Sequence, residues 1–489
     1  MLVNVSPAET RIAVIEHGIL QDLHIERTAN HSMVGSIYKA KVIRVLPGMQ
    51  AAFIDIGEPQ SGFIQLADIP TIGPDGMEGP GQRIGRIEDC LREGQQIVAQ
   101  VSRDPVASKG ARLTTRLAFS SRYLVYMPQT THIGLSRQIE SDDERSRLRD
   151  VLERALRSLN LQACGGFILR TAAVGVAGEE LEADLRLLQS QWAAVSKRVN
   201  ELAAPARVYE DWQLCHRALR DLARPGLQKI LIDDHAAFES LQAYCLNHVP
   251  ELALLLEHYI QGRPLFDLYG VEAEVNKVLD IRVELKSGAY LLIEQTGAMT
   301  TIDVNTGSFV GHKDAQETVY RTNMEAATEL ARQLRLRNLG GIIIIDFIDM
   351  RDGEHRRQVL QCLESAIEHD SAGTRISGMS DLGLVEMTRE RKRESLQHIL
   401  CEPCSVCDGR GSLKSVQTVC YEIFREIMGS GRIGQGDTLM VLAAPDMVDF
   451  LQLDEAVAVA QLEALIAKTI QFRVEPGYSR EQFDIILLQ

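Results

Sequence analysis

Two aspartates stand in apolar, strand-like stretches of the chain, and together they could perform metal-dependent chemistry. Asp303 lies in TTIDVNTG, and Asp346 follows four consecutive isoleucines in GGIIIIDFIDM. Such a run is typical of a strand buried on both faces, where an unpaired carboxylate is costly and is normally paired or metal-bound. If the two strands are neighbours, their carboxylates meet and, with waters, can hold Mg²⁺ for phosphate chemistry. The alternative interpretation is that each aspartate only opens a turn, as aspartate often does.

A second metal signal is a cluster of cysteines. Cys401, Cys404 and Cys407 follow the spacing C-x-x-C-x-x-C and are succeeded by DGRG. Two cysteines on a tight turn can grip one Zn²⁺ ion, but structural zinc requires four ligands. Either His398 or Cys420 of the same chain completes the site, or a second subunit supplies the missing ligands. In the second case, zinc would clasp a dimer.

Several arginines carry donors that suit phosphate oxygens. Arg170 and Thr171 end the strand-like stretch GFILRTA, and Arg137 lies in the same predicted unit. The planar fork of arginine and a threonine hydroxyl can bind phosphate together, although exposed arginines at strand ends are common. Arg337, before a Gly-Gly turn, has two open roles. It could stabilise charge at the metal site, or it could act as a cation at a helix C-terminus.

The elements that must position these residues begin with a small barrel. Residues 35 to about 115 show about five short strands separated by Gly and Pro, including the loop TIGPDGMEGPGQRIG. This pattern predicts an OB-fold, a common module for binding single-stranded nucleic acid. Alternation in AAFIDIG and GFIQL turns Phe53 and Phe63 away from the barrel core.

Outward phenylalanines on a small barrel are unusual for packing and suit the stacking of unpaired bases. Lys109, in the loop SKGARLTT, could attract phosphate. The competing interpretation is that a neighbouring domain covers both rings.

The rest of the chain reads as alternating helices and strands. Strands are predicted in 1–33, 119–139, 165–172, 229–233 and in a meander from 280 to the isoleucine run. Helices are predicted from the capping box Ser141–Glu144 onward, over 178–202, through much of 210–260, over 315–337, near 354–368 and, with basic character, near 385–400. The segment 416–489 reads as a last α/β unit.

Length and composition bound the class of protein. At 489 residues the chain is too long for one core, and it carries 45% hydrophobic residues and a net charge of −15. No apolar run reaches the roughly 18 residues of a membrane span, and the N-terminus lacks the pattern of a signal peptide. Nine cysteines, mostly isolated, favour a reducing compartment. We therefore expect a cytoplasmic multidomain α/β protein without a membrane segment.

In this order, the barrel, the Arg-Thr strand, the paired aspartates and the cysteine cluster resemble the ribonuclease E/G family. The most specific matches are TTIDVNTG, ARQLRLRNLGGIIIIDFIDM, GLVEMTRER and CSVCDGRG, and the resemblance covers about residues 1 to 489. It implies a Mg²⁺-dependent, single-strand-specific endoribonuclease of RNA processing, including rRNA maturation, and of mRNA decay. Such an enzyme favours RNA with a 5′-monophosphate and leaves 5′-monophosphate and 3′-hydroxyl ends.

The resemblance also implies a role for individual residues. Asp303 and Asp346 would hold Mg²⁺, and Asn305 would orient that site. Phe53, Phe63 and Lys109 would hold RNA. Arg170 and Thr171, with Val125 and Arg137 nearby, would sense the 5′-phosphate, and Cys404 and Cys407 would bind a Zn²⁺ ion shared between subunits. A further sensor arginine of the family has no clear match, because SAGTRISG around Arg375 differs.

The family architecture divides the chain into units. It implies a ribonuclease-H-like unit (1–34 with 211–278), an S1-type OB-fold domain (35–118), a 5′-sensor unit (119–210), a DNase-I-like catalytic unit (279–400), a zinc link (401–415) and a small C-terminal domain (416–489). The expected assembly is a homodimer, with a tetramer left open, and without the long scaffold tail of ribonuclease E. The other functions that the residues allow are a non-catalytic RNA-binding scaffold and a zinc-dependent chaperone-like protein.

Overall fold

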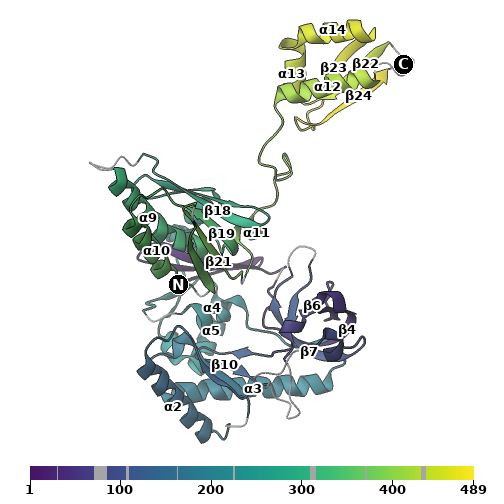
Figure 1. Ribbon diagram of the computed structural model, residues 1–489. Helices are drawn as coiled ribbons and strands as arrows, with labels where there is room; N and C mark the ends of the chain where they lie inside the picture. Colours follow the sequence, from purple (N-terminus) through teal and green to yellow (C-terminus); the bar gives the residue numbers. More distant parts are fainter. Residues whose placement is uncertain are drawn as a thin grey trace. The chain divides into compact units, whose positions relative to one another are not determined.

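The computed structural model describes most of the chain as two compact units, Met1–Ile399 and Leu400–Gln489 (Figure 1). The described residues are 1–488 without 30, 71–84, 106–108, 162–163, 224–225, 309–314, 369, 371, 381, 392 and 431–436. Most of the Gly/Pro-rich loop predicted near residue 75 lies outside them.

The N-terminal strands share a sheet with segments more than 200 residues away in the sequence. The strand order is β15-β14-β1-β2-β3, in which β1 is antiparallel to β2 and parallel to β14. The strands are β1 (Leu2–Val5), β2 (Glu9–Glu16), β3 (Ile19–Arg27), β14 (Ile230–Ile232) and β15 (Leu256–His258). Helices α4 (Leu214–Leu222) and α5 (His235–His248) contribute apolar side chains to the core on one of its faces. The expected pairing of the N-terminal strands with the region after 211 is therefore present.

The predicted five-stranded barrel is confirmed. Its strands are β4 (Ile37–Leu46), β5 (Ala51–Asp55), β6 (Gly62–Gln65), β8 (Arg112–Thr114) and β7 (Gln96–Arg103), and pairing of β4 with β7 closes it. Ile54 and Ile64 are fully buried inside. A Cβ at Gly62 would lie 2.5 Å from Leu113 Cδ1, so any other residue here would force the buried Leu113 side chain to shift. β13 (Ala206–Tyr209) pairs antiparallel with the first residues of β4, Ile37 to Lys39.

A four-stranded sheet follows the barrel, in the order β11-β12-β10-β9. Its strands are β9 (Phe119–Ser120), β10 (Leu124–Met127), β11 (Ile133–Leu135) and β12 (Gly166–Leu169). Helices α2 (Asp142–Ser158) and α3 (Gly178–Glu201) share its core. Ser141 caps α2 as predicted, because its hydroxyl accepts from the Glu144 N–H at 3.3 Å.

A six-stranded sheet carries the two aspartates, in the order β16-β17-β18-β19-β21-β20. Its strands are β16 (Arg282–Glu284), β17 (Tyr290–Gln295), β18 (Met299–Asn305), β19 (Gly341–Asp346), β20 (Thr374–Met379) and β21 (Leu384–Arg389). Helices α9 (Ala315–Leu336) and α10 (Gly353–Ile367) pack together against one face, where they bury a common apolar core.

Two sequence expectations about this sheet are wrong. The isoleucine strand is buried on one face only, because Ile343 and Ile345 face the helices whereas Ile342 is 49% exposed. The predicted basic helix near 385–400 is instead strand β21 followed by the short helix α11 (Leu396–Leu400). Val385 and Met387 alternate inward with period two, so pairing with β19 outweighs helical propensity.

The second unit is a small α/β fold around a three-stranded sheet, in the order β23-β22-β24. It contains α12 (Val416–Ser430), β22 (Thr438–Ala443), α13 (Pro445–Leu453), α14 (Ala456–Ile466), β23 (Thr469–Val474) and β24 (Phe483–Leu488), as the pattern of 416–489 predicted. In the described part of the chain, none of the helices is both long and apolar enough to cross a bilayer.

Candidate functional site

Asp303 and Asp346 meet as the sequence predicted. Strands β18 and β19 are parallel, and Asp303 is the register partner of Asp346. Both side chains are exposed on the face opposite the helices, because their neighbours Ile302, Val304 and Ile345 take the core positions. The exposed position corrects the premise that the carboxylates are buried; burial of the alternate residues is what directs them to the open face.

Asn305 supports the pair through a direct hydrogen bond. Its Nδ2 donates to Asp303 Oδ2 at 2.8 Å, two residues farther along the same strand face. This contact fixes one carboxylate oxygen of Asp303, and the described residues donate no further hydrogen bond to the other.

The surroundings of Asp346 raise the pKa of its carboxyl group above the usual value. Partial loss of solvent contributes most, followed by the negative charges of Asp303 and Asp349. A cation would relieve this mutual repulsion of carboxylates. The donor set therefore fits Mg²⁺, which prefers one or two carboxylates and keeps several waters.

Arg337 is not brought to these carboxylates. It follows the last residue of α9, where its backbone N–H donates to Gln333 O at 2.9 Å, and it precedes β19, whereas Asp346 ends that strand. Six strand residues at about 3.3 Å each separate the two ends. Arg337 is 8% exposed, and burial lowers the pKa of its guanidinium to about 10. Of its two predicted roles, this position fits the cation at a helix C-terminus.

The barrel presents the two predicted aromatic rings side by side. Phe53 of β5 and Phe63 of β6 are register partners, with ring centroids 5.7 Å apart and planes inclined by 61°. Phe53 is 40% exposed and Phe63 is half-buried. Arg44 pairs in register with Phe53, and Lys109 is exposed before β8. The described residues of the barrel therefore combine open aromatic faces with nearby positive charge.

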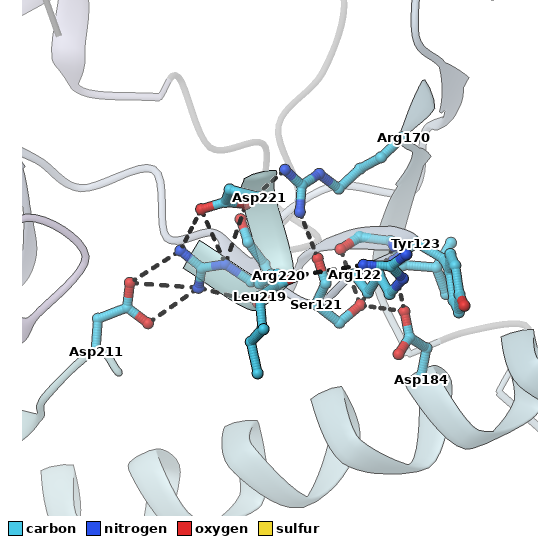
Figure 2. Close-up of polar contacts among 11 residues, drawn as sticks. Ser121, Arg122, Tyr123, Arg170, Asp184, Asp211, Leu219, Arg220 and Asp221 are labelled. Carbon is cyan, nitrogen blue, oxygen red and sulfur yellow. Dashed lines mark hydrogen bonds and ion pairs between the residues drawn. The ribbon is translucent and has the colours of Figure 1, made fainter. Parts of the chain in front are cut away.

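Arg170 and Thr171 lie at the end of β12, as predicted, but both are already engaged; Figure 2 shows the contacts of Arg170. Arg170 donates from Nη1 to Ser121 O and from Nη2 to Asp221 Oδ1, each at 2.6 Å. The Thr171 hydroxyl lies 3.1 Å from both Ser136 Oγ and Gln138 Oε1. The Arg170 side chain remains 27% exposed.

The other two predicted sensor residues lie close in the fold. Arg137 is exposed in the turn after β11, between the two residues that contact Thr171. Val125 is half-buried in β10, where it is the register partner of Ile168 in β12. The sheet thus gathers Arg137, Arg170 and Thr171 from segments more than 30 residues apart.

The cysteine cluster lies at the start of the second unit. Cys401 and Cys404 are exposed, whereas Cys407 is buried. Backbone N–H groups of Val406 and Cys407 lower the pKa of the Cys404 thiol and favour its thiolate. Among the residues that the structure describes, no three His, Cys, Asp or Glu side chains converge enough to hold a metal ion. Two cysteines on a turn fit half of a zinc site, which leaves the remaining ligands open.

Comparison with known proteins decides the family. The model of the ribonuclease E/G family matches residues 118–392, more than half of the chain. The chain belongs to the ribonuclease E/G family. Ribonuclease G of Salmonella typhimurium (strain SL1344) is 47% identical over 493 residues, covering the whole chain and 99% of that relative. Ribonuclease G of Escherichia coli (strain K12) is 46% identical with the same coverage.

In longer relatives of the family, the alignment with this chain covers a smaller share of the relative. Ribonuclease E of Escherichia coli (strain K12) is 36% identical over 431 residues, which cover 87% of this chain and 40% of that protein.

Sequence reasoning missed the partners of Arg170 in this ribonuclease E/G family chain. Asp221 follows Arg170 by 51 residues and belongs to α4. Its local sequence, ALRDLA, is that of an ordinary amphipathic helix, so no signal distinguishes it. Asp349 was missed as well, although its place three residues after Asp346 in IDFIDM was a visible clue.

Proposed function

We propose that this protein is a Mg²⁺-dependent endoribonuclease that cuts single-stranded RNA and leaves 5′-monophosphate and 3′-hydroxyl ends. One observation carries the proposal: Asp303 and Asp346 are register partners on an open sheet face, in a chain whose relatives are ribonucleases G and E. Its cellular roles would be RNA processing, including rRNA maturation, and mRNA decay.

The chemistry at this face needs little from the protein beyond placing charge. Mg²⁺, when bound, would polarise the scissile phosphate and lower the pKa of a water. Asp303 and Asp346 would hold the ion, and Asn305 keeps Asp303 oriented through its 2.8 Å hydrogen bond. The remaining coordination positions would be filled by water and RNA, so correct placement of the strand matters as much as the ligands.

The barrel and the sensor would supply that placement. Phe53 and Phe63 offer adjacent rings for stacking of unpaired bases, and Lys109 offers charge for phosphate. Arg170 and Thr171, with Arg137 and Val125 near them, would receive a 5′-monophosphate and favour RNA that carries one. Two 2.6 Å contacts hold the Arg170 guanidinium in place for such a role.

The architecture of the family supplies the finer fold assignment. The sheet of β1–β3 with β14 and β15 would be a ribonuclease-H-like unit, and the sheet of β16–β21 a DNase-I-like unit. The barrel would be an S1-type domain inserted with the sensor unit between the two halves of the first. Cys404 and Cys407 would share one Zn²⁺ with the same residues of a second chain, which gives a cytoplasmic homodimer.

The experiment that tests the proposal compares a labelled single-stranded RNA with and without Mg²⁺. Asp303→Asn and Asp346→Asn should each abolish cutting while the RNA still binds, because the carboxylate charge is lost but the shape is kept. Glu294→Gln is the matched control: it removes a carboxylate from the same face of the same sheet, one strand away, and should keep full activity. Full activity in both Asp variants would overturn the metal assignment.

The same assay separates the enzyme from a non-catalytic RNA-binding scaffold. A scaffold built on the barrel and the cysteine cluster would shift the RNA band without cutting it, whatever the Mg²⁺ concentration.

A further inference from the structure

The guanidinium group of Arg170 is already held by a carboxylate of the chain itself. Nη2 of Arg170 lies 2.6 Å from Asp221 Oδ1, and the two side chains are 27% and 37% exposed. A phosphate that docks on Arg170 would therefore find an anion in contact with its receptor. Both side chains are partly exposed, so a phosphate could contact Arg170 from the solvent side.

Asp221 belongs to an alternating row of four charges (Figure 2). Arg220 lies between two carboxylates: its Nη2 is 3.1 Å from Asp221 Oδ2, and its Nη1 is 3.2 Å from Asp211 Oδ1. Desolvation pushes the pKa of Asp221 upward, but the charges of Arg220 and Arg170 outweigh it and hold the pKa below its usual value. Asp221 is thus a stable anion, and the row Arg170–Asp221–Arg220–Asp211 carries no net charge.

The backbone around this row is fixed from both sides. Arg220 Nη1 donates to Ser120 O at 3.3 Å, and Arg122 Nη1 donates to Leu219 O at 3.1 Å. These bonds tie the C-terminal turn of α4 to the segment between β9 and β10. These bonds hold the end of the helix beside the sensor, so the Asp221 side chain is the part that can move most easily.

We propose that Asp221 is a specificity-determining residue that competes with the 5′-phosphate of RNA for Arg170. This inference rests on the proposed role of Arg170 as a 5′-phosphate sensor. Without RNA, Asp221 occupies one donor of the guanidinium group and cancels its charge. A 5′-monophosphate, which brings more negative charge and more acceptor oxygens than a carboxylate, displaces it or shares the fork. An RNA with a 5′-hydroxyl end cannot do so, and Arg170 stays with Asp221.

The direction of the effect follows from charge. The Asp221 carboxylate repels an incoming phosphate, and its removal leaves Arg170 with an uncancelled positive charge. Asp221→Asn should strengthen capture of 5′-monophosphorylated RNA on the order of tenfold, the effect of one partly exposed neighbouring charge. The gain should appear as a lower KM for the monophosphorylated RNA, and it should shrink as salt screens the charges.

A charge series distinguishes competition from a structural role. We would measure kcat/KM for one short RNA with a 5′-monophosphate or a 5′-hydroxyl end, in wild type, Asp221→Asn and Asp221→Glu. Competition predicts that the monophosphate preference rises in Asn and stays near wild type in Glu, which keeps the charge. A purely structural role predicts an unchanged preference in Asp221→Asn, because Asn keeps the shape of Asp. It predicts an altered preference in Asp221→Glu, because Glu does not keep that shape. Asp446→Asn is the matched control, because it removes the charge of an exposed carboxylate that forms an ion pair with Arg480 in the second unit.

Binding without cutting provides a second readout. In the Asp303→Asn background, fluorescence anisotropy with the same two RNAs should show tighter binding of the monophosphorylated RNA when Asp221→Asn is added. The gain should vanish when Arg170→Ala is also present, because the two residues act on one phosphate.

The outcomes separate this inference from the proposed function. A wild type that prefers monophosphorylated RNA, with a preference unchanged in Asp221→Asn, would overturn the competition and leave the nuclease and its sensor standing. A preference that appears only in Asp221→Asn would support the competition. If neither protein distinguishes the two RNAs in cutting or in binding, the sensor and the competition both fail.

Discussion

The side chains of Asp303 and Asp346 project side by side from the same face of one sheet, because parallel pairing of β18 and β19 makes the two residues register partners. Alternation decides the face: the isoleucines and valine beside them enter the core under α9 and α10. Two carboxylates so placed repel each other; partial loss of solvent, followed by this repulsion, raises the pKa of Asp346. A divalent cation between the two carboxylates would be attracted by both and would offset their repulsion. The geometry therefore favours a metal site.

Removal of the Asn305 amide should weaken the metal site without removing a ligand. Asn305→Ala deletes the N–H that holds Asp303, and loss of such a supporting contact typically costs about 10- to 100-fold in metal affinity or activity. The Mg²⁺ concentration for half-maximal cutting should rise. Asn276→Ala, on the exposed side of helix α8 (Val271–Leu279), is the control. An unchanged Mg²⁺ titration would show that Asp303 needs no such support.

Loss of an aromatic ring from the barrel should weaken RNA binding more than cutting at saturation. Phe53→Ala removes a 40% exposed ring that can stack on a base, so affinity should fall by about 1–3 kcal/mol. Binding of a short single-stranded RNA to the Asp303→Asn protein would measure this. Ile19→Ala removes a similarly exposed apolar side chain, 38%, from β3 and should have little effect. Equal losses in the two variants would argue that hydrophobic surface alone is being measured.

Asp184 should make stability depend on pH. It lies in α3, is 3% exposed and accepts from Ser121 and from the Tyr123 N–H (Figure 2). Burial raises its pKa to about 6, although these hydrogen bonds oppose the rise. A carboxyl group that binds its proton more tightly when folded contributes most stability in acid, and this contribution is lost as pH rises from about 4 to 6.

Asp184→Asn should remove that dependence. The difference in unfolding free energy between the variant and wild type should rise by roughly 2 kcal/mol from pH 4.5 to pH 7.5. Over this range wild type loses the stabilisation that comes from the raised pKa, equivalent to about 1.5 pKa units, whereas the variant has none to lose. Urea unfolding, followed through Trp192 and Trp212, would measure the difference. Asp150→Asn, on the exposed side of α2, should track wild type at both pH values. A constant difference between Asp184→Asn and wild type would contradict the raised pKa.

The buried pair Arg389–Asp370 should be costly to break. Arg389 donates to both carboxylate oxygens, at 2.6 and 3.0 Å, and to Leu339 O at 2.6 Å, and the two side chains are 5% and 4% exposed. Arg389→Met should cost about 3–5 kcal/mol, because it leaves a buried carboxylate unpaired. The double variant with Asp370→Leu should cost less than either single change. Arg357→Met, which breaks the exposed pair with Glu354, should cost at most about 1 kcal/mol.

Zinc should control the oligomeric state. If Cys404 and Cys407 share one Zn²⁺ with a second chain, Cys404→Ser should release the metal and convert dimer to monomer. Native mass spectrometry, before and after chelation, would report mass and zinc content together. Cys90→Ser, a partly buried thiol of the barrel, is the control. A dimer that survives chelation would place any zinc within one chain.

Local patterns determined much of the fold, because period-two and helical periodicities record which side chains face a core. The barrel, the outward Phe53 and Phe63, the helix capped by Ser141 and the strand that ends at Asp346 were all predictable in this way. Where two periodicities compete, local reading fails. The stretch after Leu384 has helix-forming residues, yet pairing with β19 makes it a strand.

By itself, the sequence thus determined which residues could do chemistry and on which strands they lie, since these depend on near neighbours. Only the tertiary structure decided which of them meet. It joined Asp303 to Asp346, kept Arg337 at the other end of β19 and set Asp221 against Arg170. The reason is physical: contacts between distant segments depend on sheet pairing and helix docking, which a local pattern permits but does not specify.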